Sequence, residues 1–373
     1  MIDAIHPIVM PKWGLAMEEG TVVAWLVDQG ADVQQGGDLI EVETSKINNV
    51  VETPAGGILR RQVAGEGQTV SVGMLLGVIA DAVVADDQID QFVQQFNEQA
   101  AVAAAETGEL PAPEMQSVEA GHCIINYMCS GSDDGPPVLL VHGFGGDSNN
   151  WLFTLPALAV SRTTYAVDLP GHGRSGKQIT DGSVDGLMRI LIDFLDQLSL
   201  DQVHVVGHSL GGAIGLSLAA AHPTRVVGLT LIAPAGLGKD INSQFIEGFL
   251  AAKRYKPLKV VLEMLFADSG MVNRAMADDI LRFKRLDGVV TALQTIAAAA
   301  FTDGEQTTVL RSNLRSLKIP VQVIWGHEDR IVPAAHANGL PDHVAVHLIA
   351  GAGHMVHMEK AAEVNEIILG LHA

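Results

Sequence analysis

Two kinds of hydrophobic pattern follow one another along the chain. Up to residue 80, apolar residues form short stretches that are separated by glycines at turn positions. Short apolar stretches bounded by turn residues are typical of β-strands in a small all-β domain. We therefore predict strands at residues 21–27, 39–43, 57–63 and 75–79.

The same segment contains an internal repeat. Residues 20–40 match residues 57–77 at a constant offset of 37, with glycine, valine and leucine at equivalent positions. Each half is too small to bury a core alone, so the two halves are expected to pack together as a flattened sandwich. Residues 1–80 are accordingly predicted to form a small all-β domain.

From residue 117 onward, apolar strands alternate with amphipathic helices. A helix is predicted over residues 184–198, where Leu187, Leu191 and Phe194 recur at helical spacing. Alternating strands and helices indicate a mostly parallel sheet that is covered on both faces. The strands are predicted at residues 138–141, 164–167, 203–206, 229–232, 321–325 and 343–348.

A connector, which we place at residues 81–116, joins these two domains. Apolar residues recur at helical spacing, and Asp86 and Asp87 are expected to cap a helix spanning residues 86–105. Residues 106–113 contain proline and alanine and are predicted to form a linker. The helix is either a docking segment for a partner subunit or a helix that packs on one of its neighbours.

Charge adds the main compositional information. The 373 residues include 43 acidic and 23 basic side chains, a formal net charge of −20. Residues 1–82 and residues 83–115 each carry −7, whereas residues 116–373 carry only −6. This balance argues against nucleic acid and anionic membranes as partners. Two cysteines cannot form a disulfide framework, and no targeting or membrane-spanning segment is recognisable, so we expect a cytoplasmic protein.

One lysine lies where covalent modification is feasible. Lys46 falls between the strand 39–43 and a strand predicted at 48–52, at the tip of a hairpin that a modifying enzyme can reach. With the flanking sequences around it, residues 1–80 resemble the lipoyl domains of the 2-oxo-acid dehydrogenase family, which implies lipoic acid in amide linkage to Lys46. A biotin carrier domain is the close alternative, but Ser45 and Ile47 stand where biotin domains have methionine. An ordinary surface lysine is the other alternative.

A second candidate site lies at the end of the strand 203–206. The sequence Gly-His-Ser-Leu-Gly at residues 207–211 follows this strand and opens the next helix, which is the context of the G-x-S-x-G motif. The glycines allow a sharp turn that exposes the Ser209 hydroxyl. A glycine-rich turn follows an earlier strand, so the N–H groups of Phe144 and Leu210 are the candidate oxyanion hole. A plain glycine turn is the alternative.

Two later strand ends supply partners for Ser209. Asp329 is the candidate orienting acid, with Glu328 as its competitor, and His354 is the candidate base. Many of the fourteen histidines are decoys, and most are expected to be structural. Examples of such decoys are His204, His222 and His357.

This order of motifs resembles the α/β-hydrolase superfamily over residues 117–373. The resemblance implies an α/β-hydrolase fold with a helical lid at about residues 235–305. It also implies that His354 deprotonates Ser209, Asp329 fixes the imidazole tautomer, and two backbone amides hold the oxyanion. A degenerate fold without activity is the alternative.

The two resemblances together imply a function. A lipoyl arm carries an acyl thioester, and a serine site on the same chain is suited to take the acyl group and pass it on. No histidine has aspartate four positions later, so the H-x-x-x-D signature of the usual acyltransferase domain is absent. The whole chain resembles the acyltransferase components of bacterial acetoin dehydrogenase complexes. That resemblance implies transfer of an acetyl group from acetyl-dihydrolipoyl-Lys46 to coenzyme A through acyl-Ser209.

The same resemblance implies partners and cofactors. The partners are thiamine-diphosphate-dependent acetoin-cleaving subunits and dihydrolipoamide dehydrogenase, and we expect a homo-oligomer. Lipoic acid and coenzyme A are required, and no metal is expected. Four bases within seven lid residues are candidates for contacting the coenzyme A phosphates; a solvated surface or a docking site for the acidic lipoyl domain are the alternatives. These bases are Lys253, Arg254, Lys256 and Lys259.

Two rival functions remain open. One is a serine esterase or carbon–carbon bond hydrolase, in which water accepts the acyl group and the lipoyl domain serves only for anchoring. The other is a non-enzymatic lipoyl carrier, in which the hydrolase fold serves as a scaffold.

Overall fold

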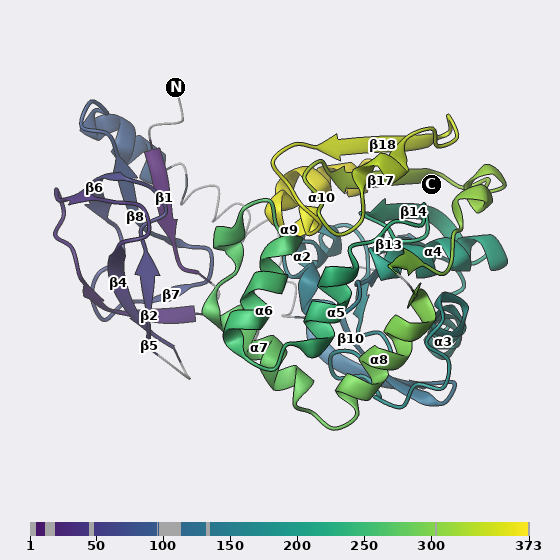
Figure 1. Ribbon diagram of the computed structural model, residues 1–373. Coiled ribbons are helices and arrows are strands. Elements are labelled where there is room, and N and C mark those ends of the chain that lie inside the picture. The colour runs from purple at the N-terminus through teal and green to yellow at the C-terminus, as the bar shows by residue number, and fades with distance from the viewer. Residues whose placement is uncertain are drawn as a thin grey trace. The chain divides into compact units, whose positions relative to one another are not determined.

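The computed structural model describes residues 5–11, 19–44, 48–94, 96, 113–131, 135–302 and 304–371. The chain divides into two compact units, Met1–Glu109 and Leu110–Ala373. Within the described residues, the first unit contains β-strands and a helix, and the second alternates strands and helices (Figure 1). The predicted fold class, a small β-sandwich followed by an α/β domain with a mostly parallel sheet, is confirmed.

Two four-stranded antiparallel sheets form the first unit. Its strands are β1 (Ile5–Val9), β2 (Glu19–Trp25), β3 (Asp32–Val33), β4 (Asp38–Glu43), β5 (Asn48–Glu52), β6 (Gly57–Gln62), β7 (Thr69–Ser71) and β8 (Leu75–Ala80). One sheet has the order β1-β8-β6-β3 and the other the order β5-β4-β2-β7. Side chains such as Val22, Leu39, Leu59 and Leu76 are fully buried in the core between the sheets, because alternate residues of a strand face inward.

The two halves of the sequence repeat pair their strands in the same way. β4 and β8, which begin 37 residues apart, each pair with the strand of their own half, β2 and β6 respectively. The β2–β4 ladder has a register shift between Val22 and Ala24, and the β6–β8 ladder has one between Leu59 and Arg61. The two halves therefore repeat the backbone irregularities as well as the strands.

The predicted connector helix packs on the first unit itself. Residues 86–94 and 96 are helical, and Ile89 is fully buried in a cluster with Leu75 and Val78 of β8. These β8 side chains lie on the face of the sheet that is turned away from the sandwich core. The apolar side of the helix is therefore occupied within its own unit, as expected for a helix that packs on a neighbour. Residues 97–105 of the predicted helix lie outside the described residues.

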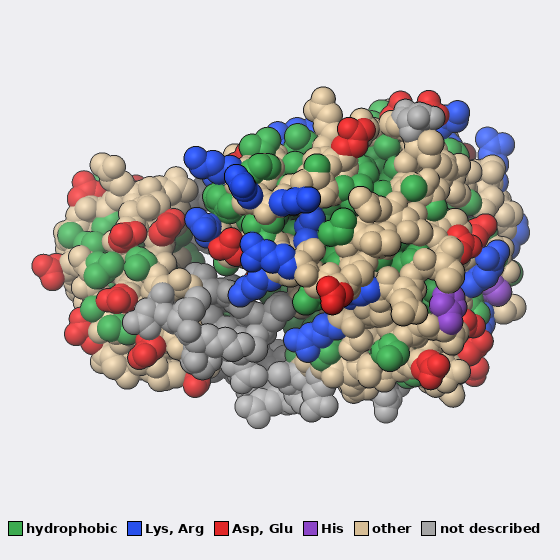
Figure 2. Space-filling view, turned by 60° about the horizontal axis from the view of Figure 1, so that its bottom comes forward, with side chains coloured by type: hydrophobic (Ala, Val, Ile, Leu, Met, Phe, Trp, Pro, Cys, Tyr) green, Lys and Arg blue, Asp and Glu red, His purple; other side chains and the backbone are tan. Residues whose placement is uncertain are grey.

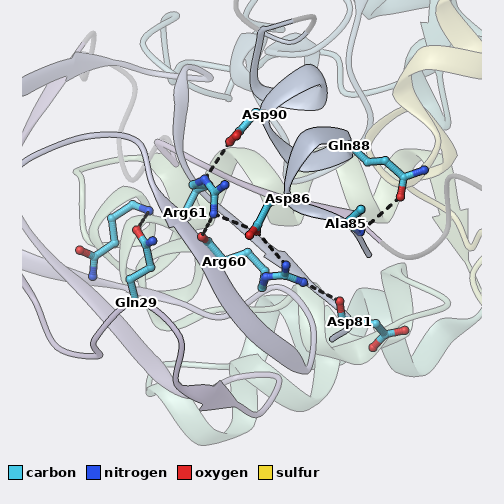
Figure 3. A network of polar contacts seen from close by, with 9 residues as sticks. Gln29, Arg60, Arg61, Asp81, Ala85, Asp86, Gln88 and Asp90 are labelled. Atoms are coloured by element: carbon cyan, nitrogen blue, oxygen red, sulfur yellow. Dashed lines mark hydrogen bonds and ion pairs between the residues drawn. The ribbon is translucent and has the colours of Figure 1, made fainter. Parts of the chain in front are cut away.

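Two arginines of β6 bind the same helix. Arg60 Nη2 donates to Asp86 Oδ1 at 2.9 Å, and Arg61 Nε donates to Asp90 Oδ1 at 2.8 Å (Figure 3). The hydrogen bond from Arg60 lowers the pKa of Asp86. The prediction that Asp86 and Asp87 cap the helix is wrong, because both are helical residues and the carboxylate of Asp86 is bound by the two arginines.

An eight-stranded sheet forms the centre of the second unit. Its strands are β9 (Glu114–Ala120), β10 (Cys123–Ser130), β11 (Val138–Val141), β12 (Thr164–Val167), β13 (Val203–His208), β14 (Val226–Ile232), β17 (Val321–Gly326) and β18 (Val344–Ile349), in the order β18-β17-β14-β13-β11-β12-β10-β9. The six strands from β18 to β12 are parallel, and β10 and β9 complete one edge in antiparallel pairing. All six predicted strands are present, whereas β9 and β10 were not predicted.

Helices cover both faces of this sheet. α3 (Val184–Gln197) and α4 (Leu210–Ala221) pack in one hydrophobic core. On the other face, η1 (Ser148–Trp151), α2 (Leu155–Ala159), α9 (Val356–Glu359) and α10 (Ala361–Leu369) enclose a second core. The two-sided cover that the alternating pattern predicts is therefore present. Within the described ranges, no helix is both long and apolar enough to cross a bilayer.

A helical layer, which we call the lid (residues 235–305), lies between β14 and β17 in the sequence. It contains α5 (Ser243–Ala251), α6 (Tyr255–Leu262), η2 (Glu263–Leu265), η3 (Ser269–Met271), α7 (Arg274–Lys284), α8 (Val289–Ala300) and the start of the hairpin of β15 (Phe301–Thr302) and β16 (Glu305–Gln306). Lys284 Nζ from α7 donates to the carbonyls of Phe249, Leu250 and Ala252 at the end of α5. A lysine at a helix C-terminus binds the carbonyls that lack a partner within the helix, so Lys284 joins two helices of the lid.

Candidate active site

Ser209 lies at a sharp turn between β13 and α4. Its backbone angles are φ 53° and ψ −117°, a conformation that non-glycine residues rarely adopt. The surrounding strands hold this turn: Ser209 N donates to the Ile232 carbonyl at 2.9 Å, and the Ser209 carbonyl accepts from Ala235 N at 2.9 Å. The strained turn therefore presents the serine at the head of a helix and at the carboxyl end of the sheet.

The glycines beside Ser209 are required by close approach of the backbone. A Cβ atom on Gly207 would overlap the Gly211 carbonyl, and a Cβ atom on Gly211 would overlap the Val141 carbonyl. A side chain fits at neither position. The G-x-S-x-G pattern from which the turn was predicted therefore has a steric cause.

Asp329 and His354 form a buried pair on two neighbouring loops. His354 Nδ1 lies 2.8 Å from Asp329 Oδ2, and their side chains are 3% and 0% exposed. The carboxylate also accepts from Trp325 Nε1 at 2.9 Å and from the N–H groups of Ile331 and Val332 at 2.7 and 3.0 Å. Because the carboxylate accepts all of these hydrogen bonds, Nδ1 of His354 must be the donor in the pair. The imidazole is therefore held with its proton on Nδ1 and with Nε2 free.

Glu328, the competing acid, takes another position. Its Oε2 accepts from Ala352 N at 3.1 Å, so this carboxylate binds the backbone before His354 and not the imidazole ring. The structure therefore brings His354 together with Asp329, as the order of motifs predicts. Trp325 was not singled out in the sequence; its position in the strand that ends just before Asp329 is the signal that could have found it.

Ser209 and His354 line the same cavity. Their side chains make no hydrogen bond to each other within the described part of the chain. Hydrogen bonds between a nucleophile and its base are often long in the absence of substrate. The cavity measures about 100 Å³, and the lid supplies about half of the residues that line it. Its lid residues include Ile241, Phe245, Phe249, Leu262, Leu265, Phe266, Met276 and Ile280.

The Phe144 and Leu210 N–H groups are available to bind an anion beside Ser209. Neither group donates to any described residue, and Phe144 lines the cavity with Ser209. Two buried histidines hold the loop that carries Phe144. His142 Nδ1 donates to the Gly143 carbonyl at 2.7 Å, and His172 Nε2 accepts from Gly145 N at 3.1 Å. Burial lowers the pKa of His142 to about 4 and of His172 to about 3, so both rings are neutral near pH 7.

Two family models match the chain. The model described as biotin-requiring enzyme matches residues 6–79, and the model described as alpha/beta hydrolase fold matches residues 136–361. The dihydrolipoyllysine-residue acetyltransferase component of the acetoin cleaving system of Pseudomonas putida is 45% identical over 371 residues, which cover 99% of this chain and 98% of that protein. The chain belongs to the family of these acetyltransferase components. The family predicted from the motifs is thus confirmed.

Further comparisons agree with this family. The corresponding acetyltransferase component of Cupriavidus necator is 43% identical over 364 residues, 98% of this chain and 96% of that protein. Among solved structures, a meta-cleavage product hydrolase of Pseudomonas fluorescens is 23% identical with a TM-score of 0.63, covering 69% of this chain and 96% of its own. A carboxylesterase of Bacillus subtilis is 19% identical with a TM-score of 0.62, covering 74% of this chain and 97% of its own. These two structures establish a shared fold.

Three histidine rings pack together beside Ser209, with the His208 ring tilted by 55° and 50° against its two neighbours. The His208 ring centroid lies 4.7 Å from that of His354 and 4.6 Å from that of His357. His208 Nε2 donates to the His354 carbonyl at 3.0 Å, so the residue before the nucleophile also holds the backbone of the base. His357, set aside from the sequence, is buried in α9, where burial lowers its pKa to about 3. His208 was missed although it lies within the motif that identified Ser209.

The lid bases of the acetyltransferase component lie on the surface and not in the cavity. Lys253, Arg254 and Lys256 are exposed, and Lys259 forms an ion pair with Glu263 at 3.6 Å. None of the four lines the cavity, whose described lining contains no lysine or arginine. Figure 2 shows lysine and arginine side chains gathered on the face of the second unit that is turned to the viewer. An arginine that was not predicted belongs with them, because the Arg274 guanidinium lies 4.6 Å from the centroid of the Tyr255 ring.

Lys46 itself lies outside the described residues. The strands on either side of it are described, and Glu43 of β4 pairs with Asn48 of β5, so only four residues join them. Within the described residues, no group of three or more histidine, cysteine, aspartate or glutamate side chains is arranged to hold a metal ion.

Proposed function

We propose that the chain transfers an acetyl group from acetyl-dihydrolipoyl-Lys46 to coenzyme A through an acetyl-Ser209 intermediate, as part of an acetoin-cleaving complex. The observation that carries this proposal is the cavity shared by Ser209, at its strained turn, and His354, whose Nδ1 is bound to the buried Asp329. The match of nearly the whole chain to acetyltransferase components of acetoin cleaving systems supports it.

The position of Lys46 suits a covalently attached lipoyl group. Glu43 and Asn48 are partners in an antiparallel ladder, which leaves the lysine in a connection of four residues. The lysine amine forms an amide with lipoic acid, and the bound group supplies an acyl thioester on a long arm. Apart from Arg60 and Arg61, which bind Asp86 and Asp90, the described strands of the first unit carry acidic charges only.

In the first half-reaction, Ser209 Oγ attacks the thioester carbonyl while His354 Nε2 takes the hydroxyl proton. A C–O bond forms, the C–S bond breaks, and His354 returns the proton to the leaving thiolate. Asp329 keeps Nδ1 protonated and stabilises the imidazolium that forms. The products are acetyl-Ser209 and a free thiol on the arm.

The Phe144 and Leu210 amides stabilise the tetrahedral oxyanion in both half-reactions. Each such donor contributes about 10²–10³ in rate. The apolar wall of the cavity strengthens these interactions because it excludes water. The two N–H groups have no competing acceptor among the described residues, so they are free to act on substrate.

In the second half-reaction, the thiol of coenzyme A replaces water as acceptor. His354 takes the thiol proton as the sulfur attacks the acetyl carbon of acetyl-Ser209. The new C–S bond forms, the C–O bond breaks, and the proton returns to Ser209 Oγ. Acetyl-coenzyme A leaves and the free serine is restored.

We further propose that the exposed lid bases bind the phosphates of coenzyme A outside the cavity. Lys253, Arg254 and Lys256 are accessible, and Lys259 lies on the same helix as Lys256. The neighbouring Tyr255 and Arg274 provide flat surfaces on which an adenine ring can stack. The partners that supply the acetyl group and reoxidise the arm are thiamine-diphosphate-dependent acetoin-cleaving subunits and dihydrolipoamide dehydrogenase, assembled around a homo-oligomer of this chain.

The variant Ser209→Ala in lipoylated protein tests the central proposal. Intact mass first verifies an increase of about 188 Da for the lipoyl group. Loss of the nucleophile is expected to lower acetyl-coenzyme A formation by at least about 10³-fold. Ser217→Ala, on the same helix and outside the cavity, is the matched control and is expected to keep its activity.

Three outcomes would contradict the proposal. Transfer at full rate by Ser209→Ala would rule out acetyl-serine. Release of acetate alone by the wild type, in the presence of coenzyme A, would favour the esterase or carbon–carbon bond hydrolase. Absence of both reactions in a correctly lipoylated chain would favour a carrier without activity of its own.

A further inference from the structure

We infer that Glu359 is a positioning residue that couples the lid to the loop of the catalytic base. Its carboxylate bridges two backbone N–H groups from distant parts of the chain: Oε1 accepts from Ala267 N at 2.7 Å, and Oε2 accepts from Gly353 N at 2.6 Å. Ala267 belongs to the lid, and Gly353 directly precedes His354. The inference rests on the proposed function, since it assigns His354 as the base.

The lid backbone lies directly against the loop of the base at this point. A Cβ atom on Gly353 would lie 2.8 Å from Ala267 N and 2.9 Å from the Leu265 carbonyl oxygen, which is closer than side chains approach. Met355 N donates to the same Leu265 carbonyl at 3.1 Å. The residue before His354 therefore packs against one stretch of lid, residues 263–267, which we call the lid turn, and the residue after His354 is hydrogen-bonded to the same stretch.

The lid turn also binds the loop of the orienting acid. The guanidinium of Arg330, the residue after Asp329, donates to the Phe266 carbonyl at 2.6 Å and to the Glu263 carbonyl. The lid turn thus holds the loops of both Asp329 and His354. Movement of this turn would shift the two partners of Ser209 together.

The lid turn is at the same time a wall of the cavity. Leu265 and Phe266 line the cavity, and so does Met355 of the base loop. A carboxylate that accepts two N–H groups makes charge-assisted bonds, which are roughly twice as strong as neutral ones. Glu359 therefore keeps the cavity closed to water in the state in which Asp329 and His354 are aligned. Closure of this kind favours transfer to a thiol over hydrolysis of acetyl-Ser209.

The test compares Glu359→Gln with Glu363→Gln in the lipoylated full-length chain. Glutamine has the size of glutamate, but it places an NH₂ group against one of the two N–H donors. Glu363 is an exposed glutamate of α10 with no partner among the described residues, so its variant removes the same charge without breaking the bridge. Thermal unfolding of both variants monitors folding.

Two measurements report on the coupling. The first is the rate at which an activated ester, p-nitrophenyl acetate, acetylates Ser209. The second is the ratio of acetate to acetyl-coenzyme A formed from acetyl-dihydrolipoyl protein and coenzyme A. Misplacement of a catalytic group by about 1 Å costs about 10²-fold in rate, so Glu359→Gln is expected to lower the first by about 10–100-fold and to raise the second at least about fivefold. Glu363→Gln is expected to stay within about twofold of the wild type for both.

Values within twofold of wild type for a folded Glu359→Gln protein overturn the inference, as does an equal effect of Glu363→Gln. If Glu359→Gln does not fold, Arg330→Met releases the second attachment of the lid turn, and the same two changes are expected; their absence again overturns the coupling. If the wild type releases only acetate, the proposed transfer fails, while the acetylation rate still decides whether Glu359 positions His354.

Discussion

Replacement of Ile89 by alanine tests what holds the helix that begins at residue 86 on the β-sandwich. Ile89 is fully buried in a cluster with Leu75 and Val78, and truncation of a buried isoleucine to alanine costs about 2–5 kcal/mol. The ion pair of Arg61 and Asp90 has side chains that are 26% and 62% exposed, and exposed pairs contribute about 0.2–1 kcal/mol. Alanine is a better helix former than isoleucine, so any loss in Ile89→Ala comes from packing.

Amide hydrogen exchange of the helix, followed by mass spectrometry on the full chain, measures the free energy of local opening. A loss of about 3 kcal/mol accelerates exchange by about 150-fold. The control Asp90→Asn is expected to accelerate it by less than about fivefold, because only the exposed ion pair is lost. Equal acceleration by the two variants, or strong acceleration of the wild type on adding about 0.5 M salt, would show that charge rather than packing holds the helix.

Two further predictions concern the α/β unit. Burial lowers the pKa of His142, His172 and His357 to about 4, 3 and 3, against an ordinary value of 6.5. Below pH 6.5 the unfolded chain therefore binds more protons than the folded chain, so the free energy of unfolding falls as the pH drops from 6.5 towards 4. The expected loss is up to about 1.4 kcal/mol per pH unit for each histidine. Urea unfolding at pH 7.5, 6.5 and 5.5 measures this loss, and a flat profile contradicts it. The second prediction concerns Trp325→Phe, which removes the indole N–H that donates to Asp329 Oδ2. A hydrogen bond to a charged group contributes about 1.5–3 kcal/mol, so this variant is expected to lower kcat for acetyl transfer about tenfold. An unchanged kcat would mean that the Ile331 and Val332 amides are sufficient to hold the carboxylate.

The main candidate residues could be predicted because each follows a strand directly. Ser209, Asp329 and His354 come from separate loops, but parallel strands end at one edge of the sheet, and that edge collects their loops. The local sequence shows both the strand and the residue after it. The pairing of His354 with Asp329 rather than Glu328 depends on backbone amides two and three residues later, which a local pattern also contains.

What could not be predicted depends on distant partners or on exposed edges. The strands β9 and β10 lie at the antiparallel edge of the sheet, where β10 alternates buried and exposed positions instead of forming an apolar run. Asp86 reads as a helix cap locally, but its partners Arg60 and Arg61 lie on another strand. Glu359 is 92 residues from Ala267 along the chain, and the local sequence around neither residue indicates that they are in contact.

The matched register shifts of the β-sandwich indicate a symmetry that relates the turn containing Lys46 to the place where the chain enters and leaves the first unit. The relation that carries β2 onto β6 and β4 onto β8 also carries β5 onto β1 and exchanges β3 with β7. The first unit therefore has approximate two-fold symmetry. Under this symmetry the connection between Glu43 and Asn48, which contains Lys46, is equivalent to the place where Ala80 pairs with Ile5. The chain connects the two strands between Glu43 and Asn48, but no connection joins Ala80 to Ile5. Of two equivalent positions in this repeated fold, one is therefore a turn that carries a lysine, and at the other the chain enters and leaves the sandwich.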